Sequence, residues 1–159
     1  TSHSLPGPLA FGWAFKASST MDSMLGYKTG SLRWLGTASA LLDDLLIFIP
    51  CRLVLITLPL VSRSWQEAPY LIRKAWQDGS KDISPNSGLS EAIFAHCAEV
   101  QMGGLNVYKN KIVNKPILAK NAGEATSQSI IRIIKISFYL ELSWLISLLI
   151  IQTIYRILY

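Results

Sequence analysis

The feature that most constrains the fold is a long apolar run near the carboxyl end of the chain. It reads ISFYLELSWLISLLIIQTIYRIL, from Ile136 to Leu158. At about 1.5 Å per residue, a helix of this length crosses a hydrocarbon core of about 30 Å. Trp144 suits the aromatic belt of a membrane surface, and Arg156 can extend to the headgroups. We predict a transmembrane helix over 136–158, in which Glu141 either faces protein or reaches the headgroups.

A second apolar run, LLIFIPCRLVLITLPLV, is interrupted by Pro50, Arg52 and Pro59. Each proline removes a backbone donor and clashes with the preceding turn, and an arginine that faces lipid is costly. We therefore expect a broken or re-entrant membrane helix over about 41–61 that lines protein or an aqueous cleft. The alternative is a kinked span whose arginine snorkels to the surface.

The first segment, 11–27, is predicted to be an amphipathic membrane helix. At about 100° per residue, five polar side chains fall within an arc of about 100° on an otherwise apolar helix. They are Lys16, Ser19, Thr20, Ser23 and Tyr27. Such a stripe requires a wet or liganded partner, and Asp22 lies just outside it.

The middle of the chain, 62–130, is polar and carries several turn signals. It has room for two short helices, over 65–77 and 89–101, and no strand alternation persists. Ten of the fifteen basic residues lie between Arg63 and Lys135, which places this segment in the cytoplasm by the positive-inside rule. The predicted fold is mainly α: a multi-helix integral membrane protein with a broken helix and a polar helical cytoplasmic segment.

Composition and cysteine spacing exclude several classes of protein. Half of the residues are hydrophobic, only 16% are charged and the mean hydropathy is +0.33, which favours a membrane protein. The net charge of +5 is not gathered into a basic run, so we expect no nucleic-acid partner. Cys51 and Cys97 lack paired spacing and are expected to be buried thiols, and the isolated His96 is more typical of a core residue than of a ligand. No GxxxxGK[ST], GxGxxG, GxSxG or HExxH motif occurs.

Two short stretches could carry chemistry. SPNSGLSEAIFA, from Ser84 to Ala95, has a turn and a glycine before a predicted helix, whose free N–H groups suit phosphate or carboxylate. An ordinary helix cap is the alternative. Asp43 and Asp44 adjoin the interrupted apolar run, where they could hold Mg²⁺ together with a nucleotide phosphate or else complement a helix dipole at a membrane boundary.

Five collinear blocks together resemble the CobD/CbiB family, the adenosylcobinamide-phosphate synthases of cobalamin biosynthesis. The blocks are KASSTMDSMLGYK, ALLDDLLIFIPCRL, SPNSGLSEAIFA, MGGLNVY and KPILAK. They cover nearly the whole chain but only the carboxy-terminal half of the family's usual length. Because the chain starts with Thr and shows no signal-peptide pattern, we expect 1–159 to be the carboxy-terminal part of a single membrane domain.

The resemblance implies a multipass enzyme of the cell membrane that joins adenosylcobyric acid to aminopropanol or its phosphate. ATP and Mg²⁺ would be required, and cobalt would enter only within the corrinoid substrate. Whether the fragment is active by itself is left open. The alternative is a non-catalytic regulatory or scaffold protein similar to AmpE-like proteins.

We assign hypothetical roles to the residues in these blocks. Asp22, Asp43 and Asp44 are the catalytic candidates, with Asp43 and Asp44 as Mg²⁺ ligands. The candidate substrate- or anion-binding residues are Lys16, Ser23, Tyr27, Lys81, Pro85, Asn86, Ser87, Gly88, Glu91, Gly103, Gly104 and Asn106. The chain departs from the family pattern at Leu41, where arginine is common, and in KPILAK, which lacks the usual glycine and acid at its end.

Overall fold

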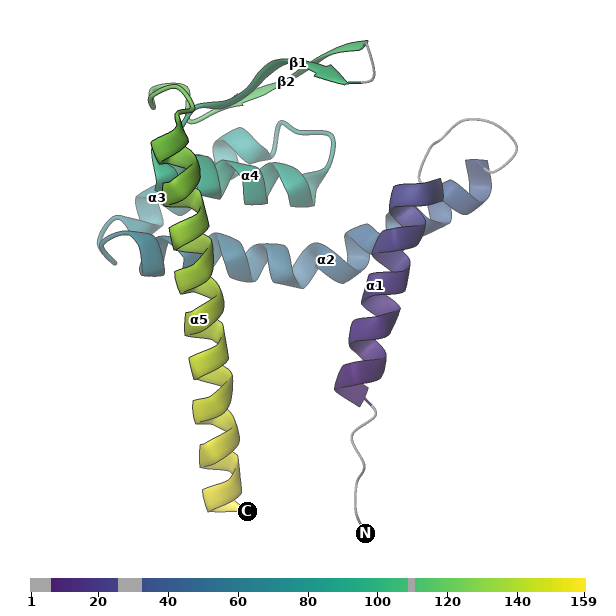
Figure 1. Cartoon of the computed structure of the whole chain (residues 1–159), viewed down its shortest axis with the longest axis vertical. Helices are drawn as coiled ribbons and strands as arrows, with labels where there is room; N and C mark the ends of the chain where they lie inside the picture. The colour runs from purple at the N-terminus through teal and green to yellow at the C-terminus, as the bar shows by residue number, and fades with distance from the viewer. Residues whose placement is uncertain (1–6, 26–32, 109–110) are drawn as a thin grey trace. The chain divides into compact units, whose positions relative to one another are not determined.

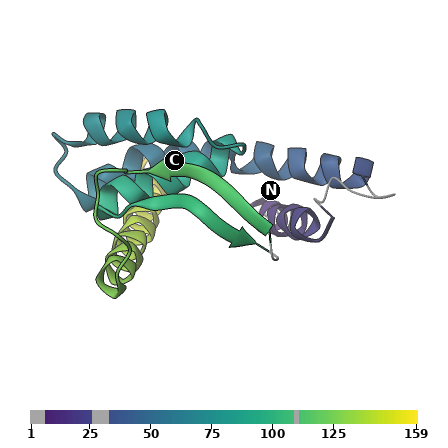
Figure 2. The ribbon, with the colours of Figure 1, turned by 90° about the horizontal axis from the view of Figure 1, so that it is seen from above.

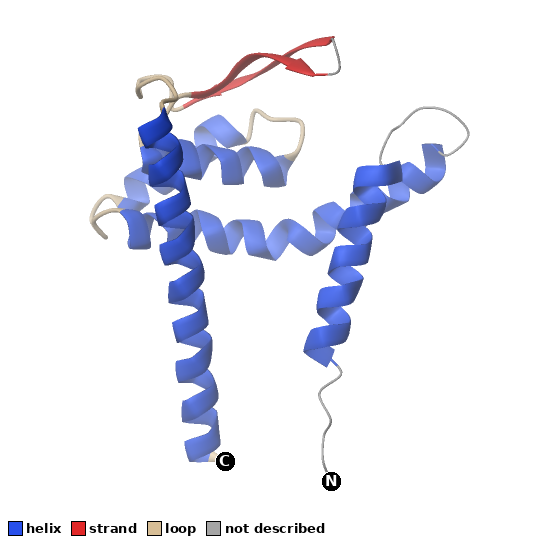
Figure 3. Cartoon of the chain, in the orientation of Figure 1, coloured by secondary structure: helices blue, strands red, loops and turns tan. Residues whose placement is uncertain are grey.

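The computed structural model describes residues 7–25, 33–108 and 111–159 of the chain. Helices dominate these residues, and a single pair of strands lies among them (Figure 1; Figure 3). The chain divides into two compact units, Thr1–Pro50 and Cys51–Tyr159. The prediction of a mainly helical protein is therefore confirmed for the part of the chain that the structure describes.

The first unit contains α1, Gly7–Leu25, and the amino-terminal part of α2, Arg33–Ser62. The predicted helix over 11–27 is confirmed as far as Leu25, and its last two residues lie outside the described residues. Ser18 of α1 and Ser39 of α2 are buried, at 3% and 2% exposure, among mostly exposed neighbours. Small hydroxyl residues at buried positions allow helix backbones to approach closely, as they do in membrane proteins.

The prediction of a broken helix is not confirmed, because α2 continues as one helix through Pro50 and Pro59. A proline removes one backbone donor, and the hydrogen bonds of the flanking turns hold the helix together. After Pro59 the ladder resumes at once, since its carbonyl accepts a hydrogen bond from the Arg63 N–H at 2.9 Å. Residues 36–62 are long and apolar enough to cross a membrane, and an 18-residue window within them has a mean hydropathy of 2.3.

The second unit is built around α4, Pro85–Ala98, which packs closely against α3, Ala68–Gly79. Two helices are confirmed here, but α4 begins four residues before the predicted Leu89 because Ser84 caps it. It also ends at Ala98, before the predicted Gln101, because Glu99 takes a left-handed conformation with φ of 52°. Left-handed backbone at this position terminates a helix.

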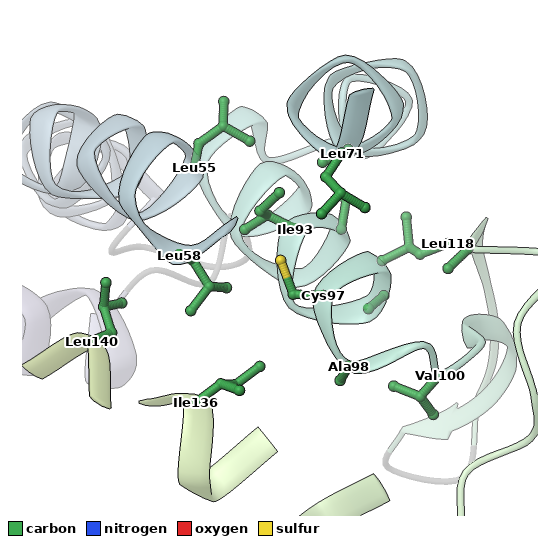
Figure 4. Close-up of a cluster of buried hydrophobic side chains, with 14 residues drawn as sticks. Leu55, Leu58, Leu71, Ile93, Cys97, Ala98, Val100, Leu118, Ile136 and Leu140 are labelled. Carbon is green, nitrogen blue, oxygen red and sulfur yellow. The ribbon is translucent and has the colours of Figure 1, made fainter. Parts of the chain in front are cut away.

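The core of the second unit gathers around α4 (Figure 4). Leu55 and Leu58 of α2 belong to this core, and Ile93 of α4 is fully buried in it. The long helix α5, Ser127–Leu158, adds Ile136 and Leu140. Burying an aliphatic side chain of this size contributes about 1.5–3 kcal/mol, so this cluster holds α2, α4 and α5 together within the unit.

An antiparallel hairpin follows α4, formed by β1, Met102–Tyr108, and β2, Lys111–Leu118 (Figure 2). The prediction that the polar middle segment contains helices and no strands is wrong here. No core imposes a regular alternation on the hairpin: Leu105 and Val107 of β1 are exposed, and the adjacent Ile112 and Val113 of β2 are both apolar and exposed. Pro116 is tolerated because it falls where the strand register shifts, in a two-stranded sheet that has free edges.

The predicted carboxy-terminal helix is confirmed and is longer than expected, because α5 begins at Ser127 instead of 136. Thr126 and Ser129 cap its start reciprocally. Within the second unit, the Trp144 indole Nε1 donates a hydrogen bond to the Thr57 Oγ1 of α2 at 3.1 Å. The helix has the length and apolarity of a membrane span, and Glu141 is exposed on it.

Candidate functional site

The first unit contains the three carboxylates that the sequence analysis proposed as catalytic. Asp22 comes from α1, and Asp43 and Asp44 come from adjacent positions of α2. Asp22 and Asp44 interact electrostatically with the Asp43 carboxylate, which also has Ser19 as a hydrogen-bond partner. The three acids and Ser19 therefore form one acidic cluster between α1 and α2.

The Asp43 carboxylate has the properties expected of a group that holds a cation. Its Oδ1 atom is buried and has no hydrogen-bond donor among the residues that the structure describes. Buried acceptors are normally satisfied, and hard carboxylate oxygens suit Mg²⁺. In the described part of the chain no three His, Cys, Asp or Glu side chains are placed so that they could hold a metal ion together, and this includes Asp22, Asp43 and Asp44. Mg²⁺ often takes only one or two protein carboxylates and completes its shell with water and phosphate, so a magnesium site at Asp43 and Asp44 remains a prediction.

The polar arc of α1 is only partly engaged by α2. Lys16, Thr20 and Ser23 are exposed, and the hydroxyls of Thr20 and Ser23 donate to backbone carbonyls one turn earlier, at 2.8 and 2.9 Å. One member of the arc, Ser19, does contact α2 through Asp43, together with Asp22, which lies just outside the arc. Tyr27 lies outside the described residues.

The start of α4 has the geometry of an ordinary helix cap, the alternative to an anion site. The Ser84 hydroxyl accepts a hydrogen bond from the Ser87 N–H at 3.4 Å, and the Ser84 carbonyl accepts one from the Gly88 N–H at 3.0 Å. Pro85 has no N–H to offer. The backbone donors of Ser87 and Gly88 are thus used inside the helix, and substrate binding by this stretch remains a prediction.

Asn86 connects α4 to α2. It is 2% exposed, and its Oδ1 atom accepts a hydrogen bond from the Arg52 guanidinium. Its carbonyl accepts one from the Cys51 thiol at 3.1 Å, and the Ser90 hydroxyl donates to that sulfur at 3.2 Å. These contacts confirm that Cys51 is buried and that Arg52 faces protein.

Gly88 lies against the backbone of Gly79, where α3 ends. A Cβ atom added at Gly88 would stand 2.4 Å from the Gly79 carbonyl oxygen, closer than any real contact of that kind. The glycines therefore allow α3 and α4 to touch through their backbones. This requirement for packing explains Gly88 independently of any ligand.

The other predicted residues of the second unit are dispersed over its surface. Lys81 forms an ion pair with Asp78 at 3.3 Å, and Glu91 pairs with Lys115 of β2 at 3.2 Å. At the start of the hairpin, Gly103 has a φ of 87° and Gly104 a φ of 79°, which side chains rarely adopt. The exposed Asn106 amide donates to the Gly104 carbonyl.

A polar cleft of about 750 Å³ in the second unit was not predicted from the sequence. Its lining comes from α3, the end of α4, the turn at 119–123 and the start of α5. On its wall the His96 Nε2 atom lies 3.0 Å from the Asp78 Oδ2 atom. Burial alone would raise the pKa of the Asp78 carboxyl, but hydrogen bonds from His96, Lys81 and the Ala119 amide hold this pKa below its usual value.

Two arginines close one side of the polar cleft and cap α4. Arg63 donates to the Cys97 carbonyl at 3.2 Å and Arg132 donates to the Ala98 carbonyl at 2.8 Å. Both guanidinium groups also contact the Glu99 carboxylate, at 2.8 and 3.5 Å. Because these residues lie far apart in the sequence, no local pattern could have indicated the cleft.

Comparison with known proteins places the chain in a family. A family model described as CobD/Cbib protein matches residues 4–137. The chain is 44% identical over 113 residues to "Cobalamin biosynthesis protein CobD" of Synechocystis, across 71% of this chain and 32% of that protein. The corresponding protein of Geobacter metallireducens is 45% identical over 115 residues, across 70% of this chain and 35% of that protein. No solved structure matches the chain.

A more distant relative extends the match. "Cobalamin biosynthesis protein CobD" of Clostridium acetobutylicum is 34% identical over 140 residues, across 87% of this chain and 44% of that protein. The chain thus matches between 32% and 44% of the length of these three relatives. Their names do not favour the AmpE-like alternative, and the resemblance seen in the five sequence blocks is confirmed. The chain belongs to the CobD/CbiB family.

Proposed function

We propose that this chain is part of an amide synthase of cobalamin biosynthesis. The enzyme would join aminopropanol or its phosphate to adenosylcobyric acid, with ATP as the source of energy, to give adenosylcobinamide or its phosphate. The relatives named for cobalamin biosynthesis support the pathway. The observation that carries the proposal for this chain is the buried, unpartnered Asp43 Oδ1 atom within a cluster of three acids.

The proposed reaction has two steps that conserve atoms and charge. A corrinoid carboxylate oxygen attacks the terminal phosphorus of ATP, which releases ADP and forms an acyl phosphate. The amine nitrogen then attacks the acyl carbon, the C–N bond forms, and inorganic phosphate leaves as the nitrogen loses its proton. Activation of this kind is needed because a free carboxylate is a poor acceptor for an amine.

Residues of the acidic cluster would divide this work. Asp43 and Asp44 would hold Mg²⁺, which supplies charge neutralisation on the phosphates of the nucleotide when bound. Asp22 would orient the amine and accept its proton, because its carboxylate interacts with Asp43 across the α1–α2 contact. Lys16, Ser23 and the predicted residues of the second unit would contribute to substrate binding.

The proposed setting is the cell membrane. Both α2 and α5 have the length and apolarity of membrane spans. We place the intervening polar segment in the cytoplasm, as the abundance of basic residues between Arg63 and Lys135 favours. The lipid bilayer and the two substrates would then be the partners of the protein.

A growth experiment tests the proposal. In a bacterium that lacks its own CobD protein, residues 4–137 would replace the matching segment of the Geobacter metallireducens relative. We expect cobalamin-dependent growth on adenosylcobyric acid with this chimera, no growth with Asp43→Asn, and full growth with the exposed control Glu124→Gln. Added cobinamide should restore growth to the Asp43→Asn strain. A chimera that reaches the membrane but supports growth only with added cobinamide would contradict the proposal.

A further inference from the structure

We propose that the polar cleft of the second unit binds the phosphate group of a small molecule, with Lys74 and Lys120 as its principal cationic contacts. The cleft is defined by α3, the end of α4, the turn at 119–123 and the start of α5. The inference rests on its shape and charge. It would stand even if the proposed amide synthesis were wrong.

The size of the cleft suits a small ligand. At about 750 Å³ it lies within the range of about 300–1,000 Å³ that is typical of small-molecule sites. Its lining is rich in charged groups that come from several elements. The cations among the lining residues are Arg63, Lys74, Lys120 and Arg132, and the acids are Glu67, Asp78 and Glu99.

The four lysine and arginine side chains outnumber the three acids by one, and Glu67 forms no ion pair with the described residues. Glu99 is shared by Arg63 and Arg132, and Asp78 is engaged by His96 and Lys81. Among the residues that the structure describes, neither Lys74 nor Lys120 has a carboxylate within 4.0 Å. The Lys74 ammonium instead lies 5.8 Å from the centre of the Tyr70 ring. Two ammonium groups beside a concave surface are therefore available to an anion.

The parts that carry these cations are held in place. The Asp78 carboxylate accepts hydrogen bonds from His96, at 3.0 Å, and from the Ala119 N–H, at 3.3 Å. Ala119 has a left-handed φ of 49°, and its carbonyl accepts the Ala122 N–H at 2.8 Å. Asp78 thus ties α3, α4 and the turn that carries Lys120 together. His96 and Asp78 are positioning residues in this account, because they act on the turn and not on the ligand.

Phosphate matches the cleft better than a carboxylate does. A phosphate group offers several strongly accepting oxygens and up to two negative charges, so it can contact two ammonium groups from different elements at once. ATP, phosphorylated aminopropanol and the headgroup of an anionic lipid all carry this group. Competition experiments can distinguish these sources.

The test measures binding of inorganic pyrophosphate to the full chain in detergent by isothermal titration calorimetry. We expect saturable binding that weakens about tenfold or more in Lys74→Gln/Lys120→Gln, because each lost charged contact is worth about a factor of ten. The matched control is Arg73→Gln/Lys135→Gln, which removes two exposed cations outside the cleft and should bind within about twofold of the original chain. Equal thermal unfolding midpoints would show that the variants are folded.

Competition then identifies the source of the phosphate. ATP, aminopropanol phosphate and vesicles of phosphatidylglycerol are each added with pyrophosphate, and loss of pyrophosphate binding with any of them supports the site and names its ligand. The absence of saturable binding, or binding that Lys74→Gln/Lys120→Gln leaves unchanged, would overturn the proposal. Neither result alters the growth test of amide synthesis, which has a separate readout.

Discussion

Arg52 of α2 donates a hydrogen bond to the Oδ1 atom of Asn86, the second residue of α4. An arginine that interrupts an apolar run is thereby joined to an amide that is only 2% exposed. The pairing explains how α2 can carry a charge among apolar residues. It also gives Asn86, a predicted substrate-binding residue, a structural role that can be tested separately.

Asn86→Ala should lower the free energy of unfolding by about 1–3 kcal/mol, because it leaves the partly buried Arg52 guanidinium without this acceptor. Asn86→Asp should be less damaging, since a carboxylate can still accept the bond. Thermal unfolding in detergent measures both effects. The exposed Asn121→Ala is the control, and an Asn86→Ala midpoint equal to that of the control would show that the contact is unimportant.

Gly88→Ala should destabilise the second unit by about 1–3 kcal/mol, because its methyl group would force α3 and α4 apart. The nearest obstacle is the Gly79 carbonyl oxygen, 2.4 Å from the added Cβ atom. Gly123→Ala is a matched control, since nothing lies within 4 Å of its Cβ position. If Gly88→Ala unfolds at the same temperature as Gly123→Ala, the described helix contact is incorrect. Any loss of substrate affinity in a Gly88 variant must be corrected for this packing effect.

Gly103→Ala and Gly104→Ala separate steric clash from backbone strain in the hairpin. Both positions have positive φ values, 87° and 79°. A Cβ atom at Gly103 would lie 2.0 Å from the Pro116 carbonyl oxygen, whereas the space around Gly104 is open. We expect Gly104→Ala to cost about 1–2 kcal/mol and Gly103→Ala to cost more. Hydrogen exchange of the hairpin amides reports the difference, and equal exchange in the two variants would contradict the described contact between Gly103 and Pro116.

Asp78 should make the stability of the protein depend on pH. Because its pKa is lowered by folding, the ionised carboxylate stabilises the folded state above the pKa of the unfolded chain, and this contribution is lost as the pH falls through the folded pKa. The difference in unfolding temperature between the original chain and Asp78→Asn should therefore be largest near neutral pH and shrink below about pH 4. A constant difference from neutral pH into that acidic range would mean that the pairing with His96 and Lys81 does not lower the pKa.

The long helices could be predicted from the sequence because apolar composition and length are local properties. The runs before Ser62 and before Leu158 are both helical, although Pro50 and Pro59 wrongly suggested a break in the first. Proline acts on one turn, while the hydrogen bonds on both sides of it still favour the helix. The hairpin was missed because its paired strands expose apolar side chains and lack the alternation that a core imposes.

The candidate site was only partly accessible to sequence reasoning. Adjacent acids such as Asp43 and Asp44 stand out by themselves, and the helical period nearly brought Asp22 into the predicted polar face. The polar cleft depends on residues that tertiary structure brings together, from Arg63 to Arg132. From the sequence alone, neither an isolated His96 nor a single Lys120 indicates that the two residues line one cleft.

The central claim, that this chain belongs to an amide synthase, is tested most directly by product formation. Membranes that contain the chimera with residues 4–137 are incubated with adenosylcobyric acid, aminopropanol phosphate, ATP and Mg²⁺. The corrinoids are then identified by mass spectrometry. We predict the amide product and ADP in equal amounts, and none with Asp43→Asn/Asp44→Asn. The account would be contradicted if the membrane-inserted chimera made no amide while the unaltered Geobacter metallireducens protein did.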